Sequence, residues 1–188
     1  MMYNPYIVGR FVYLRQPTEQ DAMGRWHEWL SDGNTTRFFN SAYWPNSQED
    51  QLDYFHSLKG KRERLVLSIV DKATDTHIGV CSLSNIDWVS RNCQVALLIG
   101  EKAFRTGSHA VESLSLLLRI AFLRLNFRMV SGGHYASSSQ TKGFMDLFRF
   151  REVGRFEDAL WLDGRYDDHV IVMLRREDWL ARNPNIEA

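Results

Sequence analysis

Apolar residues recur along the chain with two different spacings. Segments in which they alternate with polar residues, or form short runs of branched side chains, predict strands. Segments in which they recur every three or four residues predict helices, and the strongest of these places Val111, Leu114, Leu118 and Phe122 on one face. Strands are thus expected over residues 11–15, 65–71, 77–88, 92–100, 128–135, 150–160 and 166–174, and helices over residues 18–30, 47–58, 111–125 and 138–148.

Two of the expected helices begin with a capping signal. Thr18 is followed by Asp21, and Ser47 is followed by Asp50, which is the spacing of a capping box. Pro17 ends the strand before the first of these helices, because proline has no N–H to donate to a neighbouring strand. Both helix starts are therefore predicted from side-chain chemistry as well as from periodicity.

The order of the elements predicts a mixed α/β fold. An antiparallel first half runs into a β-α-β unit, so the sheet is expected to contain both pairings. Residues 89–91 and the pair Asp163-Gly164 predict hairpin turns. With 188 residues, the chain fits one domain, residues 1–188, with one continuous core.

The balance of charge excludes one broad class of partner. The chain has 23 Lys and Arg against 23 Asp and Glu, so its formal charge is zero. A nucleic-acid-binding protein usually has a basic excess, because it must displace counterions from phosphates. We therefore expect no nucleic-acid partner.

Cysteine use and hydropathy indicate a cytoplasmic protein. Cys81 and Cys93 lie in one predicted hairpin, in a register that does not place them opposite each other, so a disulfide is not expected. The longest apolar stretch, residues 114–127, contains Arg119 and Arg124 and is too short to span a bilayer. The N-terminus has no signal-peptide pattern, and we expect no membrane association.

Histidine and cysteine spacings indicate no metal site. The six histidines include no His-x-x-x-His pair, and the two cysteines are not spaced as Cys-x-x-Cys. Zinc sites commonly have such spacings. No metal is therefore expected.

Residues 95–112 form the segment whose sequence points most clearly to a binding site. A buried strand runs through a loop of small residues into the N-terminus of the strongest helix. The first-turn N–H groups of a helix lack intrahelical partners, and the helix dipole favours an anion there, so a pyrophosphate would fit. Arg105 would add a charge-assisted contact. The alternative is an ordinary connection in which Ser108 only caps the helix.

The same segment resembles the acetyl-CoA loop of GNAT acetyltransferases, written Arg/Gln-x-x-Gly-x-Gly/Ala. Arg105, Gly107, Ser108 and Ala110 fall in this frame, although Ser108 replaces a glycine of the family pattern. Glu112 stands where the family often has an acid on the helix.

The resemblance extends over roughly residues 9–180 and is closest to ribosomal-protein and other primary-amine acetyltransferases. Its further parts are residues 26–38, residues 78–100 and residues 148–168. It implies a mostly antiparallel seven-stranded sheet, flanked by about four helices, with splayed central strands. It also implies an acetyl-CoA-dependent N-acetyltransferase in which a primary amine attacks the thioester directly, acting as a monomer or homodimer.

Carried over to this sequence, the resemblance implies a cofactor site. A backbone N–H near Leu98 would polarise the thioester carbonyl. The backbone of residues 97–99 would hold the pantetheine, and the amides of residues 105–110 would hold the pyrophosphate. The implied cofactor-binding residues are Leu97, Leu98, Ile99, Arg105, Thr106, Gly107, Ser108, His109, Ala110 and Ser138.

Two residues that commonly assist proton transfer in the family are replaced here, and this affects which substrate we expect. Gln94 stands where the family often has a carboxylate, and Met145 stands where it often has a proton-donating tyrosine. Deprotonating an ε-amine of pKa about 10.4 costs roughly 4–5 kcal/mol at pH 7, whereas an α-amine of pKa about 8 costs about 1 kcal/mol. A site without a dedicated carboxylate therefore favours a peptide N-terminus or an amino sugar.

His134 and Tyr135, on the strand beside the splay, are the candidate groups for proton transfer. The alternative for His134 is a partly buried strand histidine with a satisfied hydrogen bond. The substitutions at Gln94, Ser108 and Met145 also leave open a degenerate relative that binds acyl-CoA as a sensor or regulatory module. Release of free CoA thiol would separate these two functions.

Overall fold

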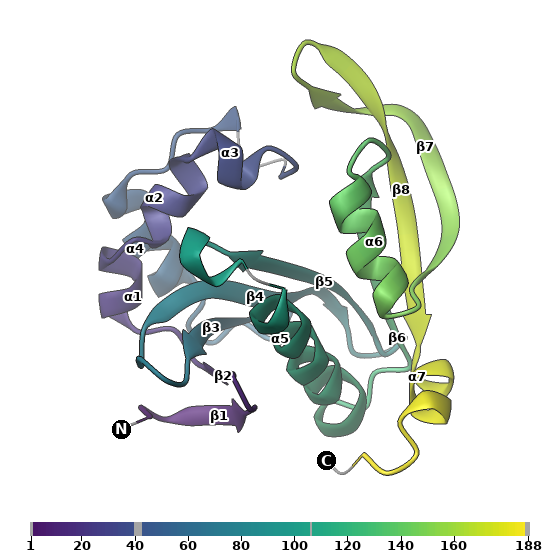
Figure 1. The fold of residues 1–188 in the computed structure, drawn as a ribbon, viewed down its shortest axis with the longest axis horizontal. Helices are drawn as coiled ribbons and strands as arrows, with labels where there is room; N and C mark the ends of the chain where they lie inside the picture. The colour runs from purple at the N-terminus through teal and green to yellow at the C-terminus, as the bar shows by residue number, and fades with distance from the viewer. Residues whose placement is uncertain (1, 40–42, 106, 187–188) are drawn as a thin grey trace.

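The computed structural model describes residues 2–39, 43–105 and 107–186, which build one eight-stranded sheet with helices on both faces (Figure 1). The strand order is β1-β2-β3-β4-β5-β6-β8-β7, and every neighbouring pair is antiparallel except β5 and β6. The strands are β1 (Pro5–Val8), β2 (Val12–Arg15), β3 (Leu65–Asp71), β4 (His77–Asp87), β5 (Asn92–Ile99), β6 (Met129–Tyr135), β7 (Arg151–Leu162) and β8 (Arg165–Arg175).

Two groups of helices cover the two faces of the sheet. The helices are α1 (Glu19–Met23), α2 (Trp26–Ser31), α3 (Gly33–Thr36), α4 (Gln48–Ser57), α5 (Ser108–Arg119), α6 (Ser139–Leu147) and α7 (Arg176–Arg182). Trp26 and Trp29 of α2 pack with Leu98 on one face, while α5 packs on the other. A π-helical segment, Ile120–Arg124, continues α5.

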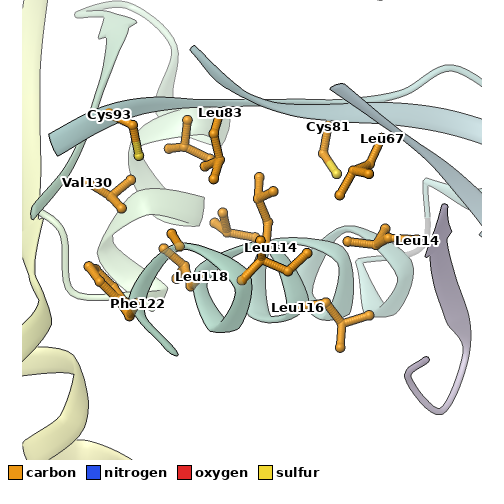
Figure 2. Packing of buried hydrophobic residues seen from close by; sticks show 14 of the residues in the cluster. Leu14, Leu67, Cys81, Leu83, Cys93, Leu114, Leu116, Leu118, Phe122 and Val130 are labelled. Carbon is orange, nitrogen blue, oxygen red and sulfur yellow. The ribbon is translucent and has the colours of Figure 1, made fainter. Parts of the chain in front are cut away.

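The main core forms between α5 and the sheet. Figure 2 shows Leu114, Leu118 and Phe122 packed among side chains from β2 to β6. All three are at most 1% exposed, and burying each stabilises the fold by roughly 2 kcal/mol. The packing confirms the helical stripe predicted from the sequence and fixes α5 against the central strands.

Both capping boxes and the central hairpin are as predicted. Thr18 and Ser47 each accept a hydrogen bond from the backbone of the aspartate three residues later. β4 and β5 pair with Cys81 opposite Leu97, so the two cysteines are not opposite each other; both are free and buried. Burial raises the pKa of both thiols, which keeps them protonated and unreactive.

The predicted single helix over residues 18–30 is wrong. The chain leaves the helical conformation at Gly24, where ψ is −143°, and two short helices, α1 and α2, result. Glycine interrupts a helix easily because it has no side chain to restrict its backbone. The break turns Trp26 and Trp29 together onto the sheet.

Three further elements were not predicted. β1 is a four-residue edge strand that contains Pro5, too short to show a period. α3 lies between the helices expected over residues 18–30 and 47–58, where no element was predicted, and α7 follows β8 without a side-chain cap. The sheet therefore has eight strands instead of seven.

Within the described residues, no helix is long and apolar enough to cross a membrane, and no metal-binding group of three side chains gathers.

Candidate active site

β5 and β6 separate after a short stretch of pairing. They pair at three positions, the last of which joins Gln94 to Ser131. β5 then continues along β4 to Ile99, whereas β6 continues along β8 to Tyr135. Figure 1 shows the β7–β8 hairpin standing well apart from the end of β5. The predicted splay of the central strands is thus confirmed.

The backbone groups of β5 alternate between β4 and the gap. Gly100 donates its N–H to the carbonyl of Ile78, 2.8 Å away, and the carbonyl of Leu98 points at Gly79, so both residues face β4. Since strand residues alternate in direction, Leu97 and Ile99 face the gap. Leu98 was expected to offer its backbone to a cofactor; the structure corrects this, because β4 already takes those groups.

The end of β5 is held rigidly by α2. The indole ring of Trp29 lies directly over Gly100, where any added Cβ would run into it. The same indole donates a hydrogen bond to Glu101, 3.1 Å away, and Arg25 pairs with this carboxylate at 2.7 Å. This clamp fixes the strand end where the loop toward α5 begins.

The loop reaches α5 through a residue that needs to be glycine. Gly107 has φ of 89°, in the region that other residues rarely adopt, and precedes the first helical residue, Ser108. The first helical hydrogen bond runs from the N–H of Val111 to the carbonyl of Gly107, at 2.9 Å. The amides before Val111, including that of Ala110, thus form the anion-favouring end of the helix. Thr106, also expected to bind cofactor, lies outside the described residues.

Arg105 does not extend toward the start of α5. Its Nε donates to the carbonyl of Ile99 at 2.9 Å, and its Nη2 donates to the carbonyl of Gly100 and the hydroxyl of Thr35, both at 2.8 Å. Its own N–H bonds to Lys102. The predicted pyrophosphate contact is therefore corrected, since the guanidinium fork satisfies the carbonyls at the strand end and ties them to α3.

His109 and Glu112 also have structural partners. The imidazole Nε2 of His109 lies 3.0 Å from Asp71 Oδ1, and its ring packs edge-on to Phe104. Burial alone would raise the pKa of Asp71, but hydrogen bonds from Thr74 and His109 lower it. The Nδ1 atom of the same ring lies 3.4 Å from the hydroxyl of Ser108, so the imidazole bridges Asp71 and the first residue of α5. Phosphate binding by His109 stays a prediction.

Glu112 closes the turn between β1 and β2. Its carboxylate accepts hydrogen bonds from the N–H groups of Arg10, Phe11 and Val12, at 2.6 to 2.8 Å. The acid that resembles a family feature of the cofactor helix therefore holds the first hairpin onto α5.

His134 is buried on β6, and its hydrogen bond defines its tautomer. Nδ1 lies 2.8 Å from the carbonyl oxygen of Tyr135. A carbonyl can only accept, so in the neutral ring Nδ1 holds the proton and Nε2 holds the lone pair. His169, on the neighbouring strand, has a pKa lowered by burial and by the charge of His134. Nε2 is thus the hydrogen-bond-accepting atom of the neutral ring, and the role of His134 in proton transfer stays a prediction.

Tyr135 belongs to an apolar wall between α3 and the β7–β8 hairpin. Its ring lies 5.5 Å from that of Phe38 and packs with Leu160 and Leu162. Burial, together with a hydrogen bond to Tyr43, raises the pKa of Tyr135 to about 12. Its phenol is therefore protonated at neutral pH. We call the side chains of Phe38, Tyr43, Tyr135, Leu160 and Leu162 the aromatic wall.

The structure also places Gln94 and Met145, which replace the carboxylate and the tyrosine common in the family. Gln94 is exposed and accepts a hydrogen bond from Asn85, 2.8 Å away. Met145 lies on α6 beside Gly132, and Ser138 caps that helix by accepting from Thr141 at 3.4 Å. Ser138 thus caps α6, and the cofactor contact that the resemblance implies for it stays a prediction.

The geometry places a strand gap beside the N-terminus of a helix, and comparison with known proteins assigns this arrangement to a family. A model described as acetyltransferase (GNAT) domain matches residues 12–146. The chain belongs to the GNAT family and is an N-acetyltransferase.

Individual relatives are distant in sequence. The chain is 23% identical over 155 residues to "Uncharacterized N-acetyltransferase p20" of Bacillus licheniformis, covering 80% of this chain and 85% of the relative. Its fold is similar to spermidine N-acetyltransferase of Vibrio cholerae, solved with CoA and spermine, with a TM-score of 0.82, 16% identity and coverage of 90% and 98%. The fold is also similar to that of a GCN5-related N-acetyltransferase of Brucella melitensis. The TM-score is 0.75 at 17% sequence identity, and the match covers 93% of this chain and 80% of that protein.

Proposed function

We propose that acetyl-CoA binds with its pantetheine in the gap between β5 and β6 and its pyrophosphate at the first turn of α5. The separation of the two strands after Gln94 is the observation that supports this most strongly. Leu97 offers its backbone N–H and carbonyl along the gap, and Ile99 offers its N–H, since its carbonyl already accepts from Arg105. The backbone from Gly107 to Ala110 offers N–H groups at the mouth of the gap.

In the proposed reaction, the neutral amine attacks the thioester carbonyl carbon. The N–C bond forms, the C–S bond breaks, and CoA leaves as the thiolate. A backbone N–H of Leu97 or Ile99 stabilises the oxyanion that develops on the carbonyl oxygen. The proton lost by the amine passes to His134 Nε2.

The acceptor is proposed to be an amine of low pKa, such as a peptide N-terminus or an amino sugar. A polyamine would need several carboxylates for its several ammonium groups, but three aspartates at the start of α3, in the β7–β8 turn and on β8 are already engaged. Asp163 pairs with Arg37 at 2.7 Å, and Asp167 accepts from Ser137 at 2.6 Å. Asp32 accepts from Thr35 and lies 3.3 Å from Lys102.

A thiol-release assay over a panel of amines tests this acceptor class. We expect an alanyl peptide amide or glucosamine to give a kcat/KM at least tenfold above spermidine or free lysine side chains at pH 7, because the latter lose about 3 kcal/mol more to deprotonation. A preference for spermidine would contradict the proposed acceptor but not the cofactor site. No thiol release with any amine would contradict acetyl transfer itself.

His134 is proposed as the general base, with Tyr135 as a neutral hydrogen-bond donor. The fixed tautomer of His134 leaves Nε2 as a proton acceptor, whereas the raised pKa of Tyr135 makes its phenol a weak acid. Proton transfer to a positioned base typically contributes 10²–10⁴-fold to the rate.

Replacing His134 by glutamine tests this role. We expect kcat/KM to fall at least 100-fold for the best amine of the panel, with CoA affinity unchanged. The acidic limb of its pH profile should become less steep, because only protonation of the amine itself would then remain. His56→Gln, an exposed position on α4, is the matched control and should change neither. A His134→Gln enzyme that keeps both rate and pH profile would return His134 to a packing role.

A further inference from the structure

Four arginines gather around a cavity at the end of the sheet opposite the cofactor gap. The cavity has a volume of about 460 Å³, and its lining includes Arg91, Arg128, Arg175 and Arg176, with Glu177 as its acidic residue. The chain as a whole has no net charge. The cavity thus brings four cationic side chains together against one carboxylate, on a chain that has no net charge.

The backbone holds three of these arginines in a row. Arg128 donates its N–H to the carbonyl of Arg91 at 2.8 Å, and Arg176 donates to the carbonyl of Arg128 at 2.9 Å. These residues border β5, β6 and β8, whose paired ends are Asn92, Met129 and Arg175. Like charges side by side on neighbouring strands repel each other. This row of arginines therefore destabilises the folded state unless an anion neutralises it.

Protein groups satisfy only part of this positive charge. Arg175 pairs with Glu177 at 3.2 Å, and Nε of Arg176 donates to the carbonyl of Phe122 at 2.9 Å. Among the residues that the structure describes, no acidic side chain lies within ion-pair distance of Arg91 or Arg128. Both of these guanidinium groups belong to exposed residues and can receive a ligand.

We propose that this cavity binds a small molecule bearing phosphate groups. Guanidinium groups bind phosphate through two parallel hydrogen bonds, and the volume is within the range of small-molecule sites. The site is separate from the cofactor gap: α5 and its π-helical extension run from Ser108 to Arg124, which spans roughly 25 Å. Figure 1 shows α7, next to the cavity, near the opposite end of α5 from the loop after β5.

Calorimetric titration with inorganic pyrophosphate tests the proposal. The Ser108→Glu protein is used as background, so that the helix start cannot itself hold pyrophosphate. We expect one binding site in this protein and an affinity at least tenfold lower when Arg91→Gln and Arg128→Gln are added. The matched control adds Arg62→Gln and Arg165→Gln, two exposed arginines outside the cavity, and should retain the affinity.

Two results would overturn the proposal. One is the absence of pyrophosphate binding to the Ser108→Glu protein. The other is an equal loss of affinity in both double-arginine variants, which would indicate attraction to overall charge. CoA affinity measured for Arg91→Gln/Arg128→Gln in the otherwise native chain verifies its fold. Should that variant fail to fold, Arg91→Gln alone replaces it, with an expected loss of at least threefold.

Discussion

Replacing Ser108 by glutamate is expected to weaken CoA binding at least 100-fold while leaving the fold intact. The new carboxylate would stand at the first residue of α5, where the account places the pyrophosphate, and the two negative charges would repel in a partly desolvated site. An acidic residue in the first turn of a helix is itself favourable, so stability should be retained or slightly raised. Calorimetry with CoA and thermal melting measure the two effects.

Ser108→Ala is the control for the loss of the hydroxyl, and it should change CoA affinity by less than about threefold. Gly107→Glu is a less clean variant, because φ of 89° at this position would strain any side-chain-bearing residue. CoA affinity that is unchanged by Ser108→Glu would move the cofactor site away from the helix start.

Replacing Asp21 by asparagine is expected to destabilise the fold by about 3–5 kcal/mol, because it leaves the charge of Arg15 buried without a partner. The two side chains form a bidentate pair at 2.5 and 2.8 Å, and both are at most 10% exposed. Ser68 donates to the same carboxylate at 2.8 Å. Urea unfolding of the variant measures the loss.

Asp146→Asn gives the matched surface control. Asp146 pairs with Lys142 at 2.6 Å, but both side chains are more than half exposed, so the expected loss is at most about 1 kcal/mol. Similar losses for the two variants would show that burial of the Arg15–Asp21 pair contributes nothing beyond an ordinary ion pair.

The carboxylate of Asp21 should also make the free energy of unfolding depend on pH. Burial alone would raise the pKa of Asp21, but hydrogen bonding from Arg15 and the charge of His77 lower it to about 2, from 3.8. The folded state therefore binds this proton less readily than the unfolded state. About 2 kcal/mol of stability is present above pH 4 and is lost as the pH falls from 4 to 2. Asp21→Asn should remove this part of the acid dependence.

The fold could be predicted largely because its main elements are periodic or capped. The stripe from Val111 to Phe122 and the capping boxes at Thr18 and Ser47 involve only local physics. β1 could not be predicted in this way, because a four-residue edge strand gains its conformation from pairing with β2. The break at Gly24 was missed because a single glycine permits a helix to end but does not require it.

The candidate site was predictable in its backbone but not in its side chains. The strand–loop–helix pattern around Gly107 places the anion-favouring helix start, since backbone geometry follows from the elements. Arg105, His109 and Glu112 instead bind Ile99, Asp71 and the β1–β2 turn, respectively. These partners are up to about 100 residues distant in the chain, and spacing within a motif cannot reveal them. The overlay of Trp29 on Gly100 was missed for the same reason.

A crystal structure with CoA would show whether the cofactor enters the gap between β5 and β6. We predict pyrophosphate oxygens within hydrogen-bond distance of the amides at residues 108–110, and the pantetheine beside Leu97 and Ile99 with its sulfur between β5 and β6. CoA bound elsewhere, or β5 and β6 fully paired beyond Gln94 in the complex, would contradict it.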